Sequence, residues 1–163
     1  MSFSFNSLKR IINLEVIITI TFVVFFISIL IGIIARQLGI SVIWTENLAT
    51  FANIWTTFIG ASILVKKFSH IRLNIFDGYL KRNSSVWNIY IIFFNLIILL
   101  ISIILAYGAL QIAITQYESN TYIFTLGIRA SYEFLSMVIG FSLAAFFSLA
   151  EIIKRIITFI GSL

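Results

Sequence analysis

Four stretches of apolar sequence, each long enough to cross a bilayer, constrain this chain more than any other feature. They lie near residues 14–35, 44–66, 86–112 and 131–153. A helix needs about 20 apolar residues to cross a hydrocarbon core of about 30 Å. Backbone groups in lipid must pair within their own segment, so each stretch is expected to be helical. The sequence therefore predicts an all-α membrane protein in which residues 1–163 form a single membrane domain with four transmembrane helices.

The composition supports a membrane location, because 61% of the residues are hydrophobic and only 10% are charged. A soluble domain usually carries about a quarter of its residues as charged side chains. The net charge of +5 would suggest a nucleic-acid partner in a soluble protein. Here the basic residues lie between the apolar stretches, where membrane topology explains them. We therefore expect membrane phospholipid as a partner, and no nucleic acid.

The basic residues are distributed unevenly among the segments that flank the spans. Nine lie before the first span, between the second and third, or after the fourth, whereas only Arg36 and Arg129 lie in the other two loops. By the positive-inside rule, both termini are expected in the cytoplasm. The residues expected to anchor the chain at the membrane surface lie on that side: Lys66, Lys67, Arg72, Lys81 and Arg82.

Two short segments combine apolar residues at helical spacing with neighbouring basic residues. The first holds Phe5, Leu8 and Ile12, and the second covers residues near 71–82. Basic amphipathic helices of this kind lie in the headgroup region of a bilayer. The pattern predicts one or two such interfacial helices, and an ordinary basic loop is the alternative for each.

The residues that usually carry chemistry in membranes are mostly missing. The single histidine, His70, falls in a predicted loop and there is no cysteine, so neither a haem held by two intramembrane histidines nor an intramembrane protease is expected. No acidic residue lies in the middle of a predicted span. Four lie near span ends, where interfacial anchoring and proton carriage are the two interpretations: Glu15, Glu46, Glu133 and Glu151. We expect no enzyme activity, no metal and no cofactor.

Small residues recur every four positions on two of the spans. The second span has Ala52, Thr56 and Gly60 at this spacing, and the fourth span has a longer series: Ser136, Gly140, Ala144 and Ser148. Small side chains allow helices to approach closely in lipid. These faces are expected to pack against protein, either within this chain or at a subunit interface.

The sequence between Arg36 and Asn74 resembles a known family. Its motifs are Trp44-Thr45-Glu46, Trp55, Phe58-Ile59-Gly60-Ala61 and His70-Ile71. They are similar to the W-x-E, W-x-x-F-x-G-A and H-I signature of the small membrane subunit of tripartite ATP-independent periplasmic (TRAP) transporters, the DctQ-like family. Thr125-Leu126-Gly127-Ile128 and Ile139-Gly140 resemble the third loop and fourth helix of that family. One departure is Asn47, where the family often has a second acidic residue.

The resemblance implies a three-part, sodium-coupled importer of carboxylate-bearing solutes, such as C4-dicarboxylates or sialic acids, in a bacterial inner membrane. The implied partners are a large membrane subunit (DctM-like) and a periplasmic solute-binding protein (DctP-like). The small subunit would be a non-catalytic scaffold, or stator, for the large one and would help to dock the binding protein. The residues expected at the partner interface are Arg36, Trp44, Glu46, Trp55, Gly60, Ser136, Gly140, Ala144 and Ser148.

Two other functions are alternatives to this interpretation. A small drug/proton antiporter also has four spans and an acidic residue in its first helix, but Glu15 lies at the edge of the span and not in its middle. A membrane anchor subunit of a redox complex is disfavoured because no histidine lies within a predicted span.

Overall fold

A computed structural model describes the backbone of residues 5–71 and 85–160, and the side chains of residues 14–67 and 89–157. Four long helices form this part of the chain: α1 (Phe5–Gln37), α2 (Ile43–Ile71), α3 (Ser85–Glu118) and α4 (Ser131–Ile160). Each helix contains an apolar span long enough to cross a membrane: Leu14–Gln37, Ile43–Lys67, Ile89–Glu118 and Ser131–Ile157. The all-helical architecture with four candidate spans is as predicted.

The predicted interfacial helices are described only in part. The first amphipathic segment lies in α1, which begins at Phe5 and continues without a break into the first span. Its position relative to the membrane stays a prediction. The second predicted helix, near residues 71–82, falls on residues 72–84, which lie outside the described part of the chain.

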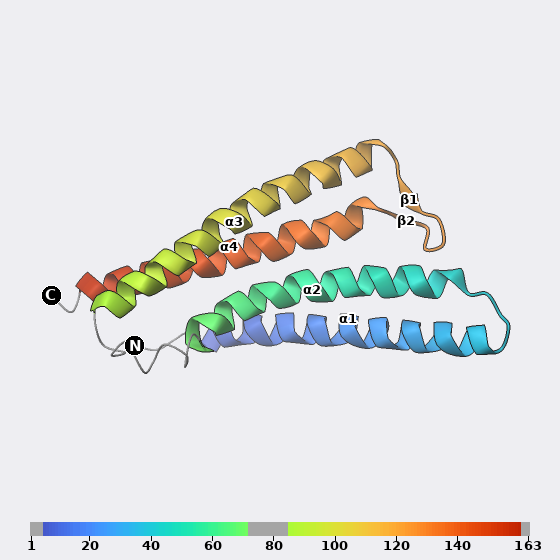
Figure 1. Ribbon diagram of the computed structural model, residues 1–163, viewed down its shortest axis with the longest axis horizontal. Helices are drawn as coiled ribbons and strands as arrows, with labels where there is room; N and C mark the ends of the chain where they lie inside the picture. Colours follow the sequence, from blue (N-terminus) through green and yellow to red (C-terminus); the bar gives the residue numbers. More distant parts are fainter. Residues whose placement is uncertain (1–4, 72–84, 161–163) are drawn as a thin grey trace.

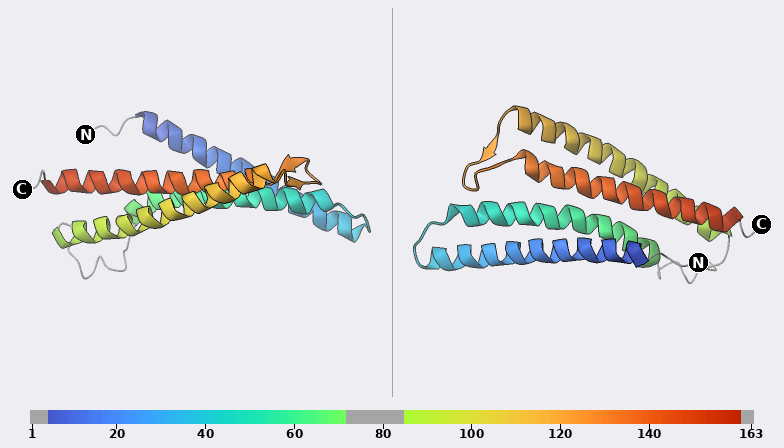
Figure 2. Two further views of the ribbon diagram at one scale, coloured as in Figure 1. Left: turned by 90° about the horizontal axis from the view of Figure 1, so that it is seen from above. Right: turned by 180° about the vertical axis from the view of Figure 1, so that it is seen from behind.

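The four helices lie side by side in a row, in the order α1, α2, α4, α3 (Figure 1). The two helical hairpins, α1–α2 and α3–α4, therefore meet through α2 and α4. Seen from above, the outer helices α1 and α3 cross the row at an angle (Figure 2). We call the end of the row with the α1–α2 turn and residues 119–130 the hairpin end, and the opposite end the terminal end.

The outer helices are the most apolar, and their positions explain why. Only 11% of the first span and 17% of the third are buried, compared with 28% of the second and of the fourth. Most Ile, Leu and Phe side chains of α1 and α3 are exposed, as expected for lipid-facing helices. The helix α3 has 34 residues and is about 50 Å long at 1.5 Å per residue, which exceeds the thickness of a hydrocarbon core.

The contact between α2 and α4 depends on a glycine. A Cβ atom added at Gly140 would lie 2.6 Å from the carbonyl oxygen of Phe58, so only glycine permits this approach of the two backbones. The ring of Phe58 packs edge-on against Phe141, with the ring centroids 5.3 Å apart. Apolar side chains gain nothing by leaving lipid, so close packing of this kind stabilises the pair of helices.

The connections at the hairpin end have defined geometry. Gly39 ends α1 with a φ of 73°, and the backbone N–H of Ile40 donates to the carbonyl of Ala35 at 2.9 Å. This is the Schellman arrangement, which satisfies the last carbonyls of a helix. Between α3 and α4 lies a short antiparallel pair of strands that was not predicted from the sequence, β1 (Tyr122–Ile123) and β2 (Ile128–Arg129).

Candidate functional site

One side of α2 is left uncovered by the rest of the chain. Seven residues recur along it at alternating spacings of three and four, which places them on one side of a helix. All of them are exposed except Gly60, which is half-buried. We call this surface the α2 free face, and its residues are Glu46, Thr50, Asn53, Thr57, Gly60, Leu64 and Lys67.

The α2 free face is polar at the middle of the span. Asn53 and Thr57 each lie two residues from Trp55, the midpoint of Ile43–Lys67, and so about 3 Å from it along the helix axis. Both side chains are exposed, and neither has a hydrogen-bond partner in the part of the chain that the structure describes. An unpaired amide in hydrocarbon costs several kcal/mol, on the order of 2–7. Lipid alone is therefore a poor environment for this surface.

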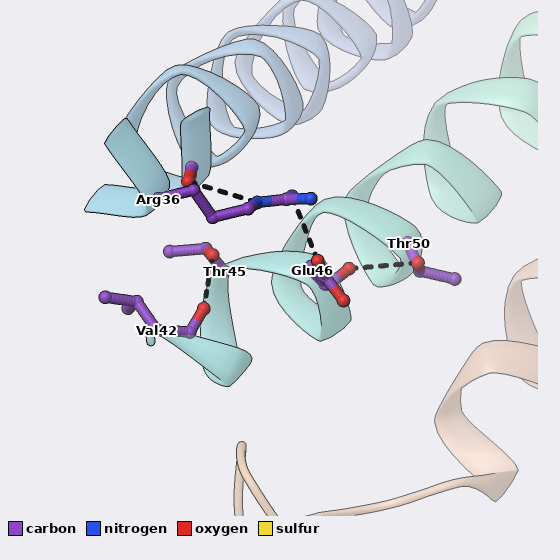
Figure 3. A network of polar contacts seen from close by, with 6 residues as sticks. Arg36, Val42, Thr45, Glu46 and Thr50 are labelled. Carbon is purple, nitrogen blue, oxygen red and sulfur yellow. Dashed lines mark hydrogen bonds and ion pairs between the residues drawn. The ribbon is translucent and has the colours of Figure 1, made fainter. Parts of the chain in front are cut away.

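An ion pair lies at the hairpin end of the α2 free face. The guanidinium Nη2 of Arg36 lies 2.9 Å from Oε1 of Glu46, and both side chains are about two-thirds exposed. Arg36 Nε also donates to the carbonyl of Gly32 at 3.4 Å, and the Thr50 hydroxyl donates to the carbonyl of Glu46 at 2.9 Å (Figure 3). The pair joins the end of α1 to the beginning of α2.

A second ion pair lies at the terminal end of the same surface. The ammonium of Lys67 lies 2.9 Å from Oε1 of Glu15 on α1, and both side chains are about half exposed. Its neighbour Lys66 instead places its ammonium 4.9 Å from the ring centroid of Phe147 on α4. The other predicted surface anchors, Arg72, Lys81 and Arg82, lie outside the described residues.

Part of the α2 free face lies in a groove between α1 and α2, with a volume of about 680 Å³. Four residues of the face line this groove: Thr57, Gly60, Leu64 and Lys67. At Gly60 an added Cβ would meet no atom within 4 Å, in contrast to the tight contact at Gly140. The groove therefore has room for a side chain that this chain does not supply.

The small-residue series of α4 is used inside the chain. All four of its members are buried: Ser136, Gly140, Ala144 and Ser148. Ser136 donates to the carbonyl of Glu133 at 2.7 Å, and Gly140 contacts α2 as described above. Packing within the chain accounts for their burial, and a contact of these residues with a partner stays a prediction.

The tryptophans predicted at the interface do not join the Arg36–Glu46 pair. Trp44 is 42% exposed at the hairpin end, but residues two positions apart on a helix do not share a side, so it points away from Glu46. Trp55 lies nine residues beyond Glu46, near Phe51, with the ring centroids 6.1 Å apart. Its indole Nε1 is buried without a hydrogen-bond partner among the described residues.

The two residues that make the α2 free face unusual, Asn53 and Thr57, were not predicted from the sequence. The spacing of four predicts that Ala52, Thr56 and Gly60 share one face, but the structure places them in different surroundings. Ala52 is buried, the Thr56 hydroxyl lies 2.8 Å from that of Thr21 on α1, and Gly60 is open. The available signal was that α2 is the least apolar of the four spans.

The loops at the hairpin end bring the two helical hairpins together and expose apolar side chains. The Asn47 amide donates to the Thr125 hydroxyl, which joins α2 to the turn between β1 and β2. Arg129 lies over the ring of Tyr117 at 4.2 Å, and its hydrogen bond with Tyr122 raises its pKa. Phe124, at the tip of the turn, is 93% exposed.

Among the described residues, no three His, Cys, Asp or Glu side chains form a group that could hold a metal ion.

Comparison with known proteins identifies the family. No curated protein matches the chain significantly. The family model described as the DctQ component of tripartite ATP-independent periplasmic transporters matches residues 25–158, which include all of α2 and α3. The chain is therefore a multi-pass membrane protein that belongs to the DctQ family, a non-catalytic component of these transporters.

Proposed function

We propose that this chain is the scaffold for the large membrane subunit of a sodium-coupled TRAP importer of carboxylate-bearing solutes. It would hold the stationary part of that subunit in the bacterial inner membrane while another part moves the solute. The importer would also need a periplasmic solute-binding protein. The family match leaves no support for the antiporter or the redox anchor considered from the sequence.

The observation that carries this proposal is the row of helices with no charge at mid-span. Each charged side chain on the four described spans lies within seven residues of a span end, from Glu15 to Arg155. Carriers usually bind substrate and ion near the middle of the membrane, between helices that are interrupted there. A row of four uninterrupted helices encloses no such site, so transport needs a partner that supplies it.

Uptake by purified components tests this function. Liposomes that contain this chain, its large membrane subunit and its binding protein should take up the solute only with an inward sodium gradient. Liposomes with this chain alone should show no uptake. Uptake by the chain alone, or full uptake by the large subunit without this chain, would refute the scaffold function.

The topology proposed here places both termini and the terminal end in the cytoplasm, and the hairpin end in the periplasm. The support is the distribution of basic residues, nine against two. The chain has no native cysteine, so single cysteines can report each side without background. In intact cells an impermeant thiol reagent should label Ser119→Cys and not Ser84→Cys, and the opposite pattern would invert the topology.

The hairpin end is where we propose that the binding protein docks. Phe124 is almost fully exposed there and makes little contact within the chain, as does Leu38, which is 69% exposed. Exposed apolar side chains of this kind are typical of protein-binding surfaces. Phe124→Ser should raise the concentration of binding protein needed for half-maximal uptake, with membrane assembly unchanged. An unchanged concentration would exclude Phe124 from the docking surface.

A further inference from the structure

We infer that the α2 free face binds one transmembrane helix of the large subunit, with Asn53 and Thr57 as the polar contacts at the middle of the membrane. This inference rests on the proposed function and specifies the surface through which it acts. It distinguishes α2 from the other three described spans, whose exposed surface is mainly apolar.

The chemistry at the middle of the face calls for a partner that donates and accepts hydrogen bonds. The Asn53 amide has donors and an acceptor, the Thr57 hydroxyl has both, and each is exposed where acyl chains would surround it. Acyl chains offer neither donor nor acceptor. A polar side chain on a protein helix can donate to and accept from these groups, and a backbone carbonyl can accept from either of them.

The spacing along the face requires an occupant as long as a membrane span. The seven residues alternate at intervals of four and three from Glu46 to Lys67. This heptad spacing is the pattern by which one helix packs along another at a shallow left-handed angle. The series spans nearly all of Ile43–Lys67, so a loop or a short peptide would leave much of it uncovered.

The groove beside the face provides a hole for side chains of that helix. The groove is about 680 Å³ in volume. Because Gly60 has no side chain, the wall leaves space at this position that a larger side chain would occupy. Thr57 and Leu64 flank this opening one turn to either side. Knobs of a partner helix inserted here would contact both α1 and α2, because Ile18 and Thr19 form the opposite wall.

A second copy of this chain is a weaker fit than the large subunit. Two copies inserted in the same orientation could meet through α2 only about an axis perpendicular to the membrane, with each residue near its counterpart. In that contact Glu46 would lie near Glu46 and Lys67 near Lys67, and each is already paired within its own chain, with Arg36 and Glu15, so a second copy would bring no charge complementarity to either end. Membership in the DctQ family provides a different partner, since other TRAP subunits assemble with this component.

Photocrosslinking in the assembled transporter tests the occupant directly. Benzoylphenylalanine in place of Asn53 or Thr57 should form an adduct with the large subunit. The matched control is Ser142, which is exposed on α4 two residues from Ala144, the midpoint of its span. The same probe there should give only lipid adducts. Adducts of Asn53 and Thr57 probes with a second copy, or with phospholipid alone, would overturn the inference.

Substitution then measures the contribution of the polar contacts. The double variant Asn53→Leu/Thr57→Leu should bind the large subunit about tenfold more weakly in detergent co-purification, given about 0.6 kcal/mol for each of the two interhelical polar contacts. Its thermal stability as an isolated chain should not fall, and Ser142→Leu should co-purify normally. Full retention by the double variant refutes the inference and leaves the scaffold function standing. Failure of the wild-type chain to retain the large subunit refutes both.

Discussion

The helices α2 and α4 occupy equivalent inner positions in the row and bury the same share of their spans, 28%, yet they expose different chemistry. The exposed side of α4 is apolar apart from Ser142 and the two ends of the span: Leu135, Ile139, Phe146, Leu149 and Ile153. The exposed side of α2 has Asn53 and Thr57 at its middle. In a membrane protein, therefore, exposure alone does not identify a binding surface. A cluster of exposed polar groups at the depth of the hydrocarbon core, such as Asn53 and Thr57, is the stronger indication of one.

The glycines of the two helices provide a second comparison. On α4, small residues permit contact with the backbone of α2 at Gly140. On α2, the small residue Gly60 faces open space. The two glycines look alike in the sequence, since each lies in a series of small residues at a spacing of four. Substitutions at the two glycines test this difference.

The largest expected effect is on the stability of the isolated chain when each glycine is replaced by leucine. Gly140→Leu places a side chain against the Phe58 backbone, which cannot move aside, and should lower the free energy of unfolding by about 3 kcal/mol. Gly60→Leu should not lower it, since glycine-to-leucine replacement favours the helix by up to about 1 kcal/mol. Thermal unfolding in detergent measures both. Similar destabilisation by the two variants would contradict the comparison.

The next effect concerns the acidic residues of the two helices. Glu151 is 8% exposed and pairs with Arg155 at 3.0 Å, whereas the Arg36–Glu46 pair is about two-thirds exposed. Glu151→Gln removes one partner of a largely buried pair and should cost about 2 kcal/mol of stability. Glu46→Gln should cost less than about 1 kcal/mol, because exposed pairs are screened by solvent.

Salt provides the control for these two variants. In about 1 M salt the exposed Arg36–Glu46 pair should no longer contribute to the free energy of unfolding of the wild-type chain. The contribution of the largely buried Glu151–Arg155 pair should mostly persist. Equal losses for Glu151→Gln and Glu46→Gln at low salt would show that burial does not distinguish these pairs.

The smallest effect compares two neighbouring threonines on α2. Thr56 contacts Thr21 on α1 through their hydroxyls, and Thr57 lies on the α2 free face. Replacement by valine keeps the branched shape in both. Thr56→Val should cost the isolated chain about 0.6 kcal/mol, a typical value for one interhelical hydrogen bond in a membrane, and Thr57→Val should cost close to nothing. A larger loss at Thr57 would mean that it has an undetected partner within the chain.

The sequence predicts the helices because they depend on short-range chemistry, and the local ion pairs have the same origin. Uncharged stretches of about 20 residues locate the spans, and Glu151 and Arg155 are four residues apart on one helix. The pair between Arg36 and Glu46 also spans only a short turn. Chain connectivity places all of these groups close together.

The order of the helices and the Glu15–Lys67 pair could not be predicted in this way. Glu15 and Lys67 are far apart in the sequence, and their contact depends on how α1 and α2 align along their full lengths. The α2 free face depends in turn on which sides of α2 are covered by α1 and α4. Hydropathy alone could not show that Asn53 is uncovered while Asn95 on α3 is buried, since both are asparagines within apolar spans.

The row arrangement has a consequence for assembly. The hairpins α1–α2 and α3–α4 are joined in space mainly by one seam, where Phe58 meets Gly140, with the Asn47–Thr125 hydrogen bond at its hairpin end. Each hairpin has its own internal helix pair and its own two apolar spans. Two fragments divided between α2 and α3 should therefore insert independently and associate within the bilayer. Fragment complementation would then isolate the strength of a single helix–helix seam.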